Sequence, residues 1–320
     1  MSIRWRLWGS VTLVFLLTLG FFVGFLRVPL EVWLLRQPHV ASIIFLVCVA
    51  LALVPLWILL GWLINRRICS ERDIVPFGLP VLASVPNWKN TRKLTPWLRG
   101  LTIESFLQIV TFLLHGNDAG RKTLVFTSPD QGDGKSLIAM NVAIAFASVA
   151  PRVLIVDADV RRPSLHAKFE VSNEIGLADV LAGSTTLMSS VLVTRHAGLD
   201  LLTSGTHTDS PYQLLQSERF DYFLEEALRV YRLVIIDSPA LEPVIDATVL
   251  CKKASATILV LGAGDTQYRS LETALQRLSR VGVSVGQHNL LGVILNRTRP
   301  AAKPGDEYTP PPGTASLRFP

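Results

Sequence analysis

Short, uninterrupted apolar runs alternate with segments of helical length, and this pattern constrains the fold more than any other feature. Two of the intervening segments, 217–231 and 270–282, have the length of surface helices. Strands that are apolar at every position are buried on both faces, which is typical of parallel sheets covered by helices. We therefore predict an α/β fold with a mostly parallel sheet between two helical layers. The runs are TLVFTS (123–128), RVLIVDAD (152–159), LDLLTS (199–204), RLVIIDSP (232–239), ATILVLGA (256–263) and LLGVILNR (290–297).

Two longer apolar runs lie nearer the N-terminus, from Leu7 to Leu26 and from Val40 to Ile64, and neither contains a charged residue. About 20 apolar residues suffice for a helix to cross a bilayer. A signal peptide has a shorter apolar core followed by a cleavage site with small residues, and the first run meets neither condition. Residues 1–65 are therefore predicted to form a two-helix transmembrane hairpin.

The distribution of arginine predicts the orientation of this hairpin. Two arginines precede the first run and three follow the second at 66–72, whereas the connection has two arginines partly offset by one glutamate. Positive charge is retained on the cytoplasmic side, so both termini should be cytoplasmic. We expect cysteine-accessibility labelling to find only residues near 28–39 on the outer face. Labelling of residue 90 or 310 from outside would overturn this topology.

Net charge separates the N-terminal third from the rest. Residues 1–100 carry eleven Lys or Arg against three Asp or Glu, a balance of +8, whereas the remainder carries 20 against 22. The remainder therefore lacks the excess of positive charge that is typical of nucleic-acid-binding domains, and we expect no nucleic-acid partner. The basic, proline-containing segment 66–100 is predicted to be a juxtamembrane linker that contacts anionic lipid or stays solvated, with one short strand candidate, PVLASVP (80–86). Residues 101–299 form the predicted globular domain, and the proline-rich tail 300–320 is predicted to be disordered.

A glycine-rich loop, SPDQGDGKS, connects the first predicted strand of the domain to the following helix. A lysine at a helix N-terminus is unfavourable beside the positive end of the dipole unless an anion lies between them. In phosphate-binding loops, glycines let backbone N–H groups surround the phosphate, lysine adds charge, and the next hydroxyl ligates Mg²⁺. The strict G-x-x-x-x-G-K-[ST] pattern fails at Pro129, so the loop alone does not exclude an ordinary turn. The predicted nucleotide-binding residues here are Gly132, Asp133, Gly134, Lys135, Ser136 and Leu137.

Three aspartates follow apolar runs that we predict to be strands. Asp157 and Asp159 end one run, and Asp237 ends another. The carboxyl ends of parallel strands form the edge at which open α/β sheets bind ligands. A single aspartate at such a place is commonly a helix N-cap, but three around a Gly-Lys-Ser loop favour a Mg²⁺–nucleotide site.

Taken in order, these motifs resemble those of the bacterial tyrosine kinases (BY-kinases), which belong to the MinD/ParA-like group of deviant Walker ATPases. SPDQGDGKS resembles their Walker A loop, where proline at the first position is familiar. LIVDADVRRPSLHAKF (154–169) resembles the Walker A′ motif, and VIIDSPALEPVIDA (234–247) resembles the Walker B region. The resemblance covers about residues 70–299. It implies a P-loop NTPase fold, ATP and Mg²⁺ as cofactors, and regulation of capsular or exopolysaccharide synthesis and export at the bacterial inner membrane.

The resemblance also implies roles for single residues. Lys135 would hold the phosphates, and Asp157 would lie beside the metal and help to activate the incoming hydroxyl. Asn296 is where relatives contact adenine, although a turn residue at a strand end is an equally good interpretation. Tyr308 is the candidate phosphoacceptor in the tail. The implied catalytic residues are Lys135, Asp157, Asp159 and Asp237, and the implied metal ligands are Ser136, Asp159 and Asp237.

The chain departs from the family pattern in three places. Only Val28–His39 connect the two apolar runs, where relatives carry a large periplasmic domain. The oligomerisation motif E-x-x-R-x-x-R appears as Glu104, Leu107 and Val110, and the tail tyrosine cluster is reduced to Tyr308. We expect Leu107 and Val110 to pack against the sheet or another hydrophobic surface, and homo-oligomeric ring assembly to be weak.

The leading interpretation is a membrane-anchored, BY-kinase-like protein that autophosphorylates on tyrosine or hydrolyses ATP. Its implied partners are a chain-length determinant or polysaccharide polymerase and export proteins, and a tyrosine phosphatase. A non-kinase, MinD-like switch that controls a membrane partner is the alternative, because the tail has only one tyrosine in place of the family's cluster. A third class, a nucleotide-binding scaffold without turnover, is disfavoured by the intact Lys135, Asp157 and Asp237.

Overall fold

The computed structural model describes residues 66–87, 96–115, 122–205, 210–285 and 289–299, with a few helical positions between 47 and 57. Apart from those positions, the predicted transmembrane hairpin lies outside the described residues, as does the tail with Tyr308. Within the described ranges, no helix is both long and apolar enough to cross a membrane. The chain divides into two units, Met1–Arg66 and Arg67–Pro320, and the second contains the α/β fold.

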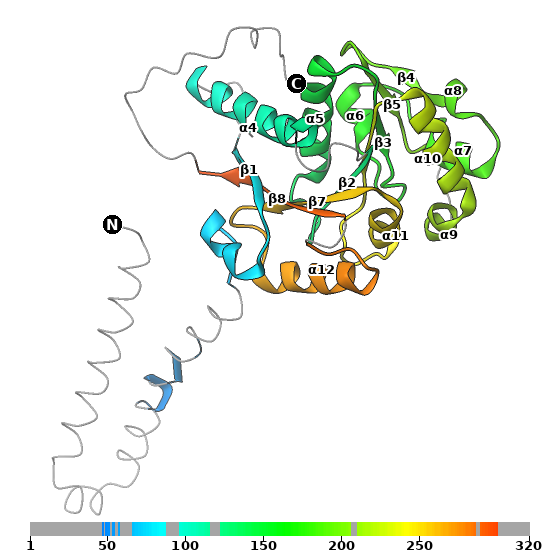
Figure 1. The fold of residues 1–320 in the computed structure, drawn as a ribbon. Coiled ribbons are helices and arrows are strands. Elements are labelled where there is room, and N and C mark those ends of the chain that lie inside the picture. Colours follow the sequence, from blue (N-terminus) through cyan, green and yellow to red (C-terminus); the bar gives the residue numbers. More distant parts are fainter. Residues whose placement is uncertain are drawn as a thin grey trace, which may run out of the picture. The chain divides into compact units, whose positions relative to one another are not determined.

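An eight-stranded sheet forms the centre of the second unit (Figure 1). The strand order is β1-β8-β7-β2-β6-β3-β5-β4, and neighbours are parallel except for β4 and β5. This confirms the predicted mostly parallel sheet. The strands are β1 (Val81–Pro86), β2 (Thr123–Thr127), β3 (Val153–Asp157), β4 (Leu192–Val193), β5 (Leu199–Leu202), β6 (Leu233–Asp237), β7 (Ala256–Gly262) and β8 (Leu290–Thr298).

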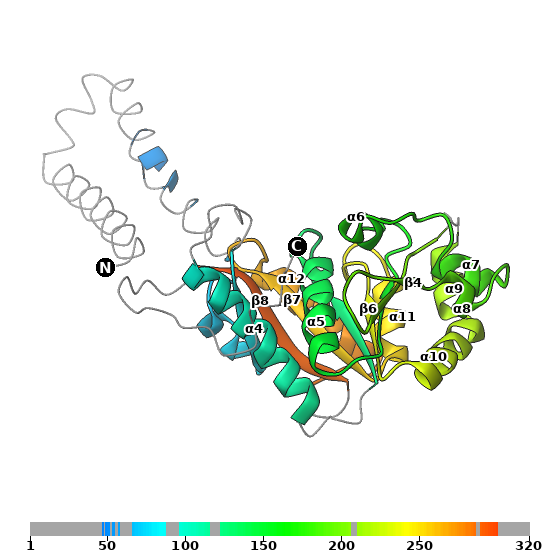
Figure 2. The same ribbon diagram turned by 90° about the horizontal axis from the view of Figure 1, so that it is seen from above.

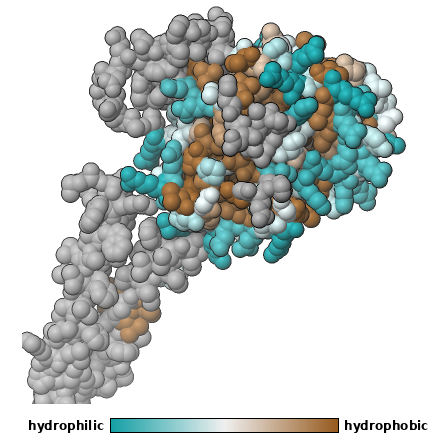
Figure 3. All heavy atoms as spheres, viewed as in Figure 1, coloured by the Kyte–Doolittle hydropathy of each residue, from teal (hydrophilic) through white to brown (hydrophobic). Residues whose placement is uncertain are grey.

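Helices cover both faces of the sheet, as the view from above also shows (Figure 2). One face packs against α4 (Pro96–His115) and α5 (Lys135–Val149), and the other against α10 (Glu218–Val230), α11 (Asp246–Lys253) and α12 (Tyr268–Arg280). The shorter helices are α6 (Leu165–Phe169), α7 (Leu177–Ala182), α8 (Leu187–Ser190) and α9 (Pro211–Gln216). Hydrophilic residues predominate on the surface around α10, at the right of Figure 3, as expected for an amphipathic surface helix.

The uninterrupted apolar runs form strands because both sides of the sheet are core. In β2, Leu124 and Phe126 belong to the cluster with α4 and α5, whereas Val125 belongs to the cluster on the opposite face. Successive side chains of a strand point to opposite faces, so every position of such a strand is buried. Each fully buried aliphatic or aromatic side chain contributes roughly 1.5–3 kcal/mol of hydrophobic free energy.

The segment predicted as a linker, 66–100, contains folded elements, and the strand predicted at 80–86 is confirmed as β1. Two 3-10 turns, η1 (Glu71–Asp73) and η2 (Val75–Phe77), lead into β1, which pairs with β8 at the edge of the sheet. Ile68 and Ile74 are fully buried in the main core. The prolines that suggested a linker are compatible with this structure, because an edge strand and a 3-10 turn both tolerate a missing N–H. Residues 66–87 therefore add an edge strand and its connection to the sheet.

Helix α4 carries the altered oligomerisation motif. Val110 is buried in the cluster between α4, α5 and the sheet, Leu107 is half-buried, and Glu104 is exposed. The expectation that Val110 packs against the sheet is confirmed. An arginine at this position would need a buried partner, whereas valine adds apolar area to the core.

Candidate functional site

The glycine-rich loop and the three aspartates lie together at the carboxyl edge of the sheet. The loop follows β2 and enters α5 at Lys135, Asp157 ends β3, and Asp237 ends β6. Strand β6 lies between β2 and β3, and Asp157 is in register with Asp237. The strand order therefore assembles the predicted residues from three distant segments.

Two glycines give the loop its shape. Gly132 has a φ of 89° and Gly134 a φ of 94°, both in the left-handed region that favours glycine. A Cβ on Gly134 would lie 2.2 Å from Nδ2 of Asn296. Glycine at 134 therefore lets the amide of Asn296 approach the loop. Leu137 is half-buried in the first turn of α5.

Lys135 lies between two carboxylates. Its Nζ is 3.3 Å from Oδ2 of Asp159 and 3.9 Å from Oδ1 of Asp237, and it donates to Oγ of Ser136 at 3.3 Å. Burial favours the neutral amine, but the charges of Asp237 and Asp159 outweigh it and raise the pKa of Lys135. A lysine at a helix N-terminus needs an anion beside it, and in the absence of nucleotide the carboxylates of Asp159 and Asp237 are that anion.

Asp237 is the most unusual group of the site. Its side chain is 0% exposed, and neither carboxylate oxygen accepts a hydrogen bond of good geometry from a described residue, although the Ser136 hydroxyl is near enough to lower its pKa. Burial raises the pKa of Asp237 to about 7, although the positive charge of Lys135 opposes this. Because buried acceptors without donors are costly, such a carboxylate indicates a place for a cation.

Asp157 combines both interpretations made from the sequence. Its Oδ2 accepts hydrogen bonds from the backbone N–H groups of Ser164 and Leu165, each at 2.8 Å, and these residues begin α6. The carboxylate therefore caps a helix while standing beside the other two aspartates. Burial raises the pKa of Asp157, and the two N–H groups oppose the rise. These bonds fix the carboxylate in one orientation.

The arginines after Asp159 are held by the protein. Arg161 forms an ion pair with Asp246, the first residue of α11, and Arg162 donates to Oε1 of Gln131 in the loop. Asp159 itself accepts from the backbone N–H of Arg162 at 3.1 Å and pairs with Lys135 through its other oxygen. Arg161 thus ties the segment after β3 to α11, a contact that the sequence analysis did not identify.

Asn296 lies at the site, but its amide contacts the loop. Its Nδ2 donates to the backbone carbonyl of Asp133 at 2.8 Å, and its Oδ1 accepts from the N–H of Arg297 at 2.9 Å. With both polar groups used, Asn296 holds the glycine-rich loop, which matches the turn-residue interpretation and leaves the adenine contact a prediction. Burial raises the pKa of Asp133 to about 6, while a hydrogen bond from Thr266 opposes the rise.

The donor set fits Mg²⁺ held together with phosphate and water. Within the described ranges, no group of three or more His, Cys, Asp and Glu side chains is arranged to hold a metal ion on its own. Mg²⁺ keeps several waters and is usually bound through one or two carboxylates and the substrate's phosphates. Ser136, Asp159 and Asp237 surround Lys135, and the oxygens of Asp237, which lack a well-placed hydrogen-bond donor, are suitable acceptors.

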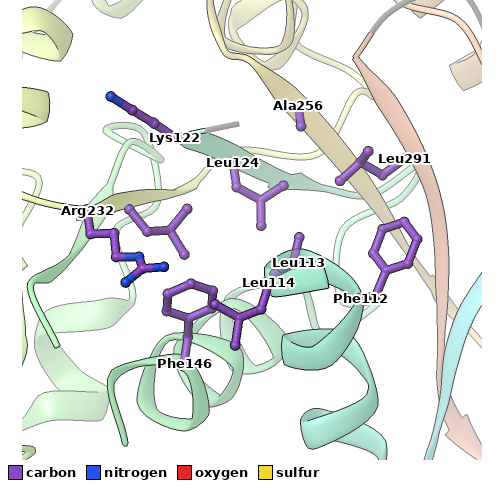
Figure 4. A pocket seen from close by; sticks show the side chains of 10 residues that line it. Phe112, Leu113, Leu114, Lys122, Leu124, Phe146, Arg232, Ala256 and Leu291 are labelled. Carbon is purple, nitrogen blue, oxygen red and sulfur yellow. The ribbon is translucent and has the colours of Figure 1, made fainter. Parts of the chain in front are cut away.

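A cavity of about 150 Å³ lies at the opposite edge of the sheet, where the strands begin (Figure 4). Both α4 and α5 end here, so their terminal carbonyl groups make this edge electronegative. Lys122 and Arg232 at the cavity offset that charge, which favours a structural role for them. Figure 4 shows the Lys122 side chain extending away from the apolar walls. The apolar walls are Phe112, Leu113, Leu114, Leu124, Phe146, Leu233, Ala256 and Leu291.

Comparisons with known proteins agree with this geometry. The family described as the CobQ/CobB/MinD/ParA nucleotide binding domain matches residues 124–308. The chain is 34% identical over 179 residues to tyrosine-protein kinase YwqD of Bacillus subtilis, covering 56% of this chain and 73% of that protein. It is 30% identical over 259 residues to tyrosine-protein kinase wzc of Salmonella typhimurium, covering 75% of this chain and only 35% of that protein. The solved kinase domain of the Escherichia coli tyrosine kinase ETK superposes with a TM-score of 0.66 at 27% identity, covering 76% of this chain and 99% of that domain.

Proposed function

Because the chain belongs to the CobQ/CobB/MinD/ParA nucleotide-binding family and, within it, to the bacterial tyrosine-protein kinases, we propose that it is a membrane-anchored, Mg·ATP-dependent phosphotransferase of capsular or exopolysaccharide synthesis. One observation carries the proposal. Lys135, at the start of α5, lies within 4 Å of the carboxylates that end β6 and follow β3. Such a constellation neutralises and orients a polyphosphate.

The site's own residues explain how a nucleotide would bind. The first turn of α5 presents backbone N–H groups and the positive end of its dipole to the phosphates. On binding, Lys135 exchanges its carboxylate partners for β- and γ-phosphate oxygens. Ser136, Asp159 and Asp237 are then free to hold Mg²⁺, directly or through water. When bound, the metal neutralises charge on the transferred phosphoryl group.

Asp157 takes a different role because its position is fixed. The two N–H groups of α6 hold one oxygen of its carboxylate, and its burial raises its pKa above that of an ordinary aspartate. A carboxylate with a raised pKa is a better proton acceptor. Asp157 is therefore proposed to orient the attacking hydroxyl, of tyrosine or of water, and to accept its proton.

Incubation of the full chain with γ-labelled ATP and Mg²⁺ tests this function directly. A kinase transfers label to protein tyrosine, whereas a MinD-like ATPase switch releases labelled phosphate only. The switch remains the second candidate because α4 lacks both motif arginines and the tail has a single tyrosine. Absence of both products and of Mg·ATP binding would refute the proposal.

The proposed place of action is the cytoplasmic face of the bacterial inner membrane. The two apolar runs before Arg66 support anchoring, and the short connection 28–39 leaves no room for a periplasmic domain. Recognition of glycan outside the membrane would then require a partner of the chain-length-determinant or polymerase class. A tyrosine phosphatase would reverse the modification.

We expect weak autophosphorylation with at most one phosphotyrosine, at Tyr308. Relatives assemble rings through the motif arginines, and here Leu107 and Val110 cannot make charged contacts. A single acceptor also lowers the effective concentration of tyrosine at a neighbouring site. Intact-mass spectrometry after incubation with Mg·ATP measures the phosphate content. Several phosphates per chain, together with a stable octamer by light scattering, would show that the loss of the arginines does not matter.

A further inference from the structure

We infer that Thr266 is a positioning residue for nucleotide binding, which acts by fixing Asp133 in the glycine-rich loop. Thr266 lies in the turn between β7 and α12, and no sequence motif marked it. The inference rests on the proposed function, because the ligand of the loop is taken to be Mg·ATP.

The hydroxyl of Thr266 has one available orientation. It accepts a hydrogen bond from the backbone N–H of Gly262 at 2.8 Å and lies 2.9 Å from Oδ1 of Asp133. A hydroxyl has one proton to donate. Since the carboxylate only accepts, that proton points at Asp133. Thr266 is 0% exposed, so water does not compete for this bond.

Asp133 is the side chain through which the loop can be held. It stands between Gly132 and Gly134, which have no side chains and adopt positive φ angles. Its second oxygen accepts from the N–H of Asp130 at 3.2 Å, and its backbone carbonyl accepts from Asn296. Thr266 therefore attaches the loop to β7, while Asn296 attaches it to β8.

Thr266 is itself held firmly. Its N–H donates to the carbonyl of Gly262 at 2.9 Å, and its carbonyl accepts from the N–H of Ile68 at 2.9 Å. Ile68 is fully buried. A fixed donor that holds a glycine-flanked residue reduces the number of loop conformations. Because the loop is already ordered before the nucleotide binds, binding does not have to supply the free energy of ordering it, and the affinity is higher.

Removal of the hydroxyl should weaken nucleotide binding without changing the chemical step. We compare the full chain with Thr266→Val, which keeps the volume, with Thr266→Ser, which restores the donor, and with Thr257→Val. Thr257 lies in β7, and its buried hydroxyl makes no hydrogen bond to the glycine-rich loop. Thr266→Val should raise the Kd for Mg·ATP about tenfold, as expected for loss of a hydrogen bond to a charged group. Its KM should rise with kcat unchanged, and Thr266→Ser and Thr257→Val should bind as the wild type does.

Hydrogen exchange in the absence of nucleotide gives a readout that does not depend on the proposed function. Amides of residues 130–136 should exchange faster in Thr266→Val than in the wild type, and Thr257→Val should leave them unchanged. Wild-type affinity in Thr266→Val, an equal loss in Thr266→Ser, or unchanged loop exchange would each overturn the inference. Should the wild-type chain fail to bind Mg·ATP, the proposed function is wrong, and the exchange comparison still decides whether Thr266 orders the loop.

Discussion

Replacing Lys135 with alanine is expected to abolish detectable binding of Mg·ATP. Lys135 Nζ is the positive group nearest the predicted phosphate position, and it lies 3.3 Å and 3.9 Å from the carboxylates of Asp159 and Asp237. Without it, three aspartates face the polyphosphate, and repulsion adds to the loss of charge-assisted hydrogen bonds. We expect an affinity at least about a hundredfold lower, or about 2.7 kcal/mol. Calorimetric titration of the variant measures the effect.

Two comparisons separate this effect from unfolding. Lys122→Ala removes an exposed lysine at the opposite edge of the sheet and should leave nucleotide affinity unchanged. In Lys135→Ala, Asp237 loses its nearest cation, so the pKa of Asp237 rises further. The carboxyl group then takes up a proton and becomes neutral, and the protein stays folded because no unpaired charge is left buried. Circular dichroism should therefore match the wild type. An unchanged Kd for Mg·ATP in a folded Lys135→Ala variant would contradict the role given to Lys135.

Local patterns predicted the core of the fold because both faces of the sheet are buried. Each of the six apolar runs contains a strand, and the residues at the ends of β3 and β6 reach the same edge since parallel strands share a direction. The strand order itself does not follow from such patterns. It depends on how the helices pack, and here it places β6 between β2 and β3, so that Asp237 lies beside Lys135.

Polar contacts between distant segments were the least predictable part. Thr266 in a turn and Arg161 on a loop look like ordinary surface residues in the sequence, and their partners lie 133 and 85 positions away. The only available signal for Thr266 was its place just after an apolar run, at the edge where ligands bind. In segment 66–87 the run PVLASVP (80–86) predicted the strand itself, but its place at the edge of the sheet beside β8 is a contact between distant segments that the pattern did not indicate.

Replacing Asp237 with asparagine is expected to stabilise the nucleotide-free protein while removing its affinity for Mg·ATP. Burial raises the pKa of Asp237 to about 7. The carboxyl group of Asp237 therefore binds its proton more tightly in the folded protein than in the unfolded chain. Asp237 therefore costs stability in full above about pH 7, the cost shrinks as the pH falls below 7, and it disappears only below about pH 4, the ordinary pKa of an aspartate. Asparagine is neutral throughout. Its stabilising effect should be on the order of 4 kcal/mol at pH 8 and only about 1–2 kcal/mol at pH 5.

Denaturant unfolding at the two pH values, without nucleotide, measures this difference. Asp221→Asn is the matched control, because Asp221 is about half-exposed and pairs with Lys253 on the surface. Surface pairs contribute little, so this control should change stability by less than about 1 kcal/mol at either pH. Greater stability of the wild type at pH 8, or retained Mg·ATP affinity in Asp237→Asn, would refute the cation role of Asp237. The opposite signs expected for stability and binding follow from one cause, the burial of a carboxylate without a well-placed hydrogen-bond donor, which costs folding free energy until Mg²⁺ binds.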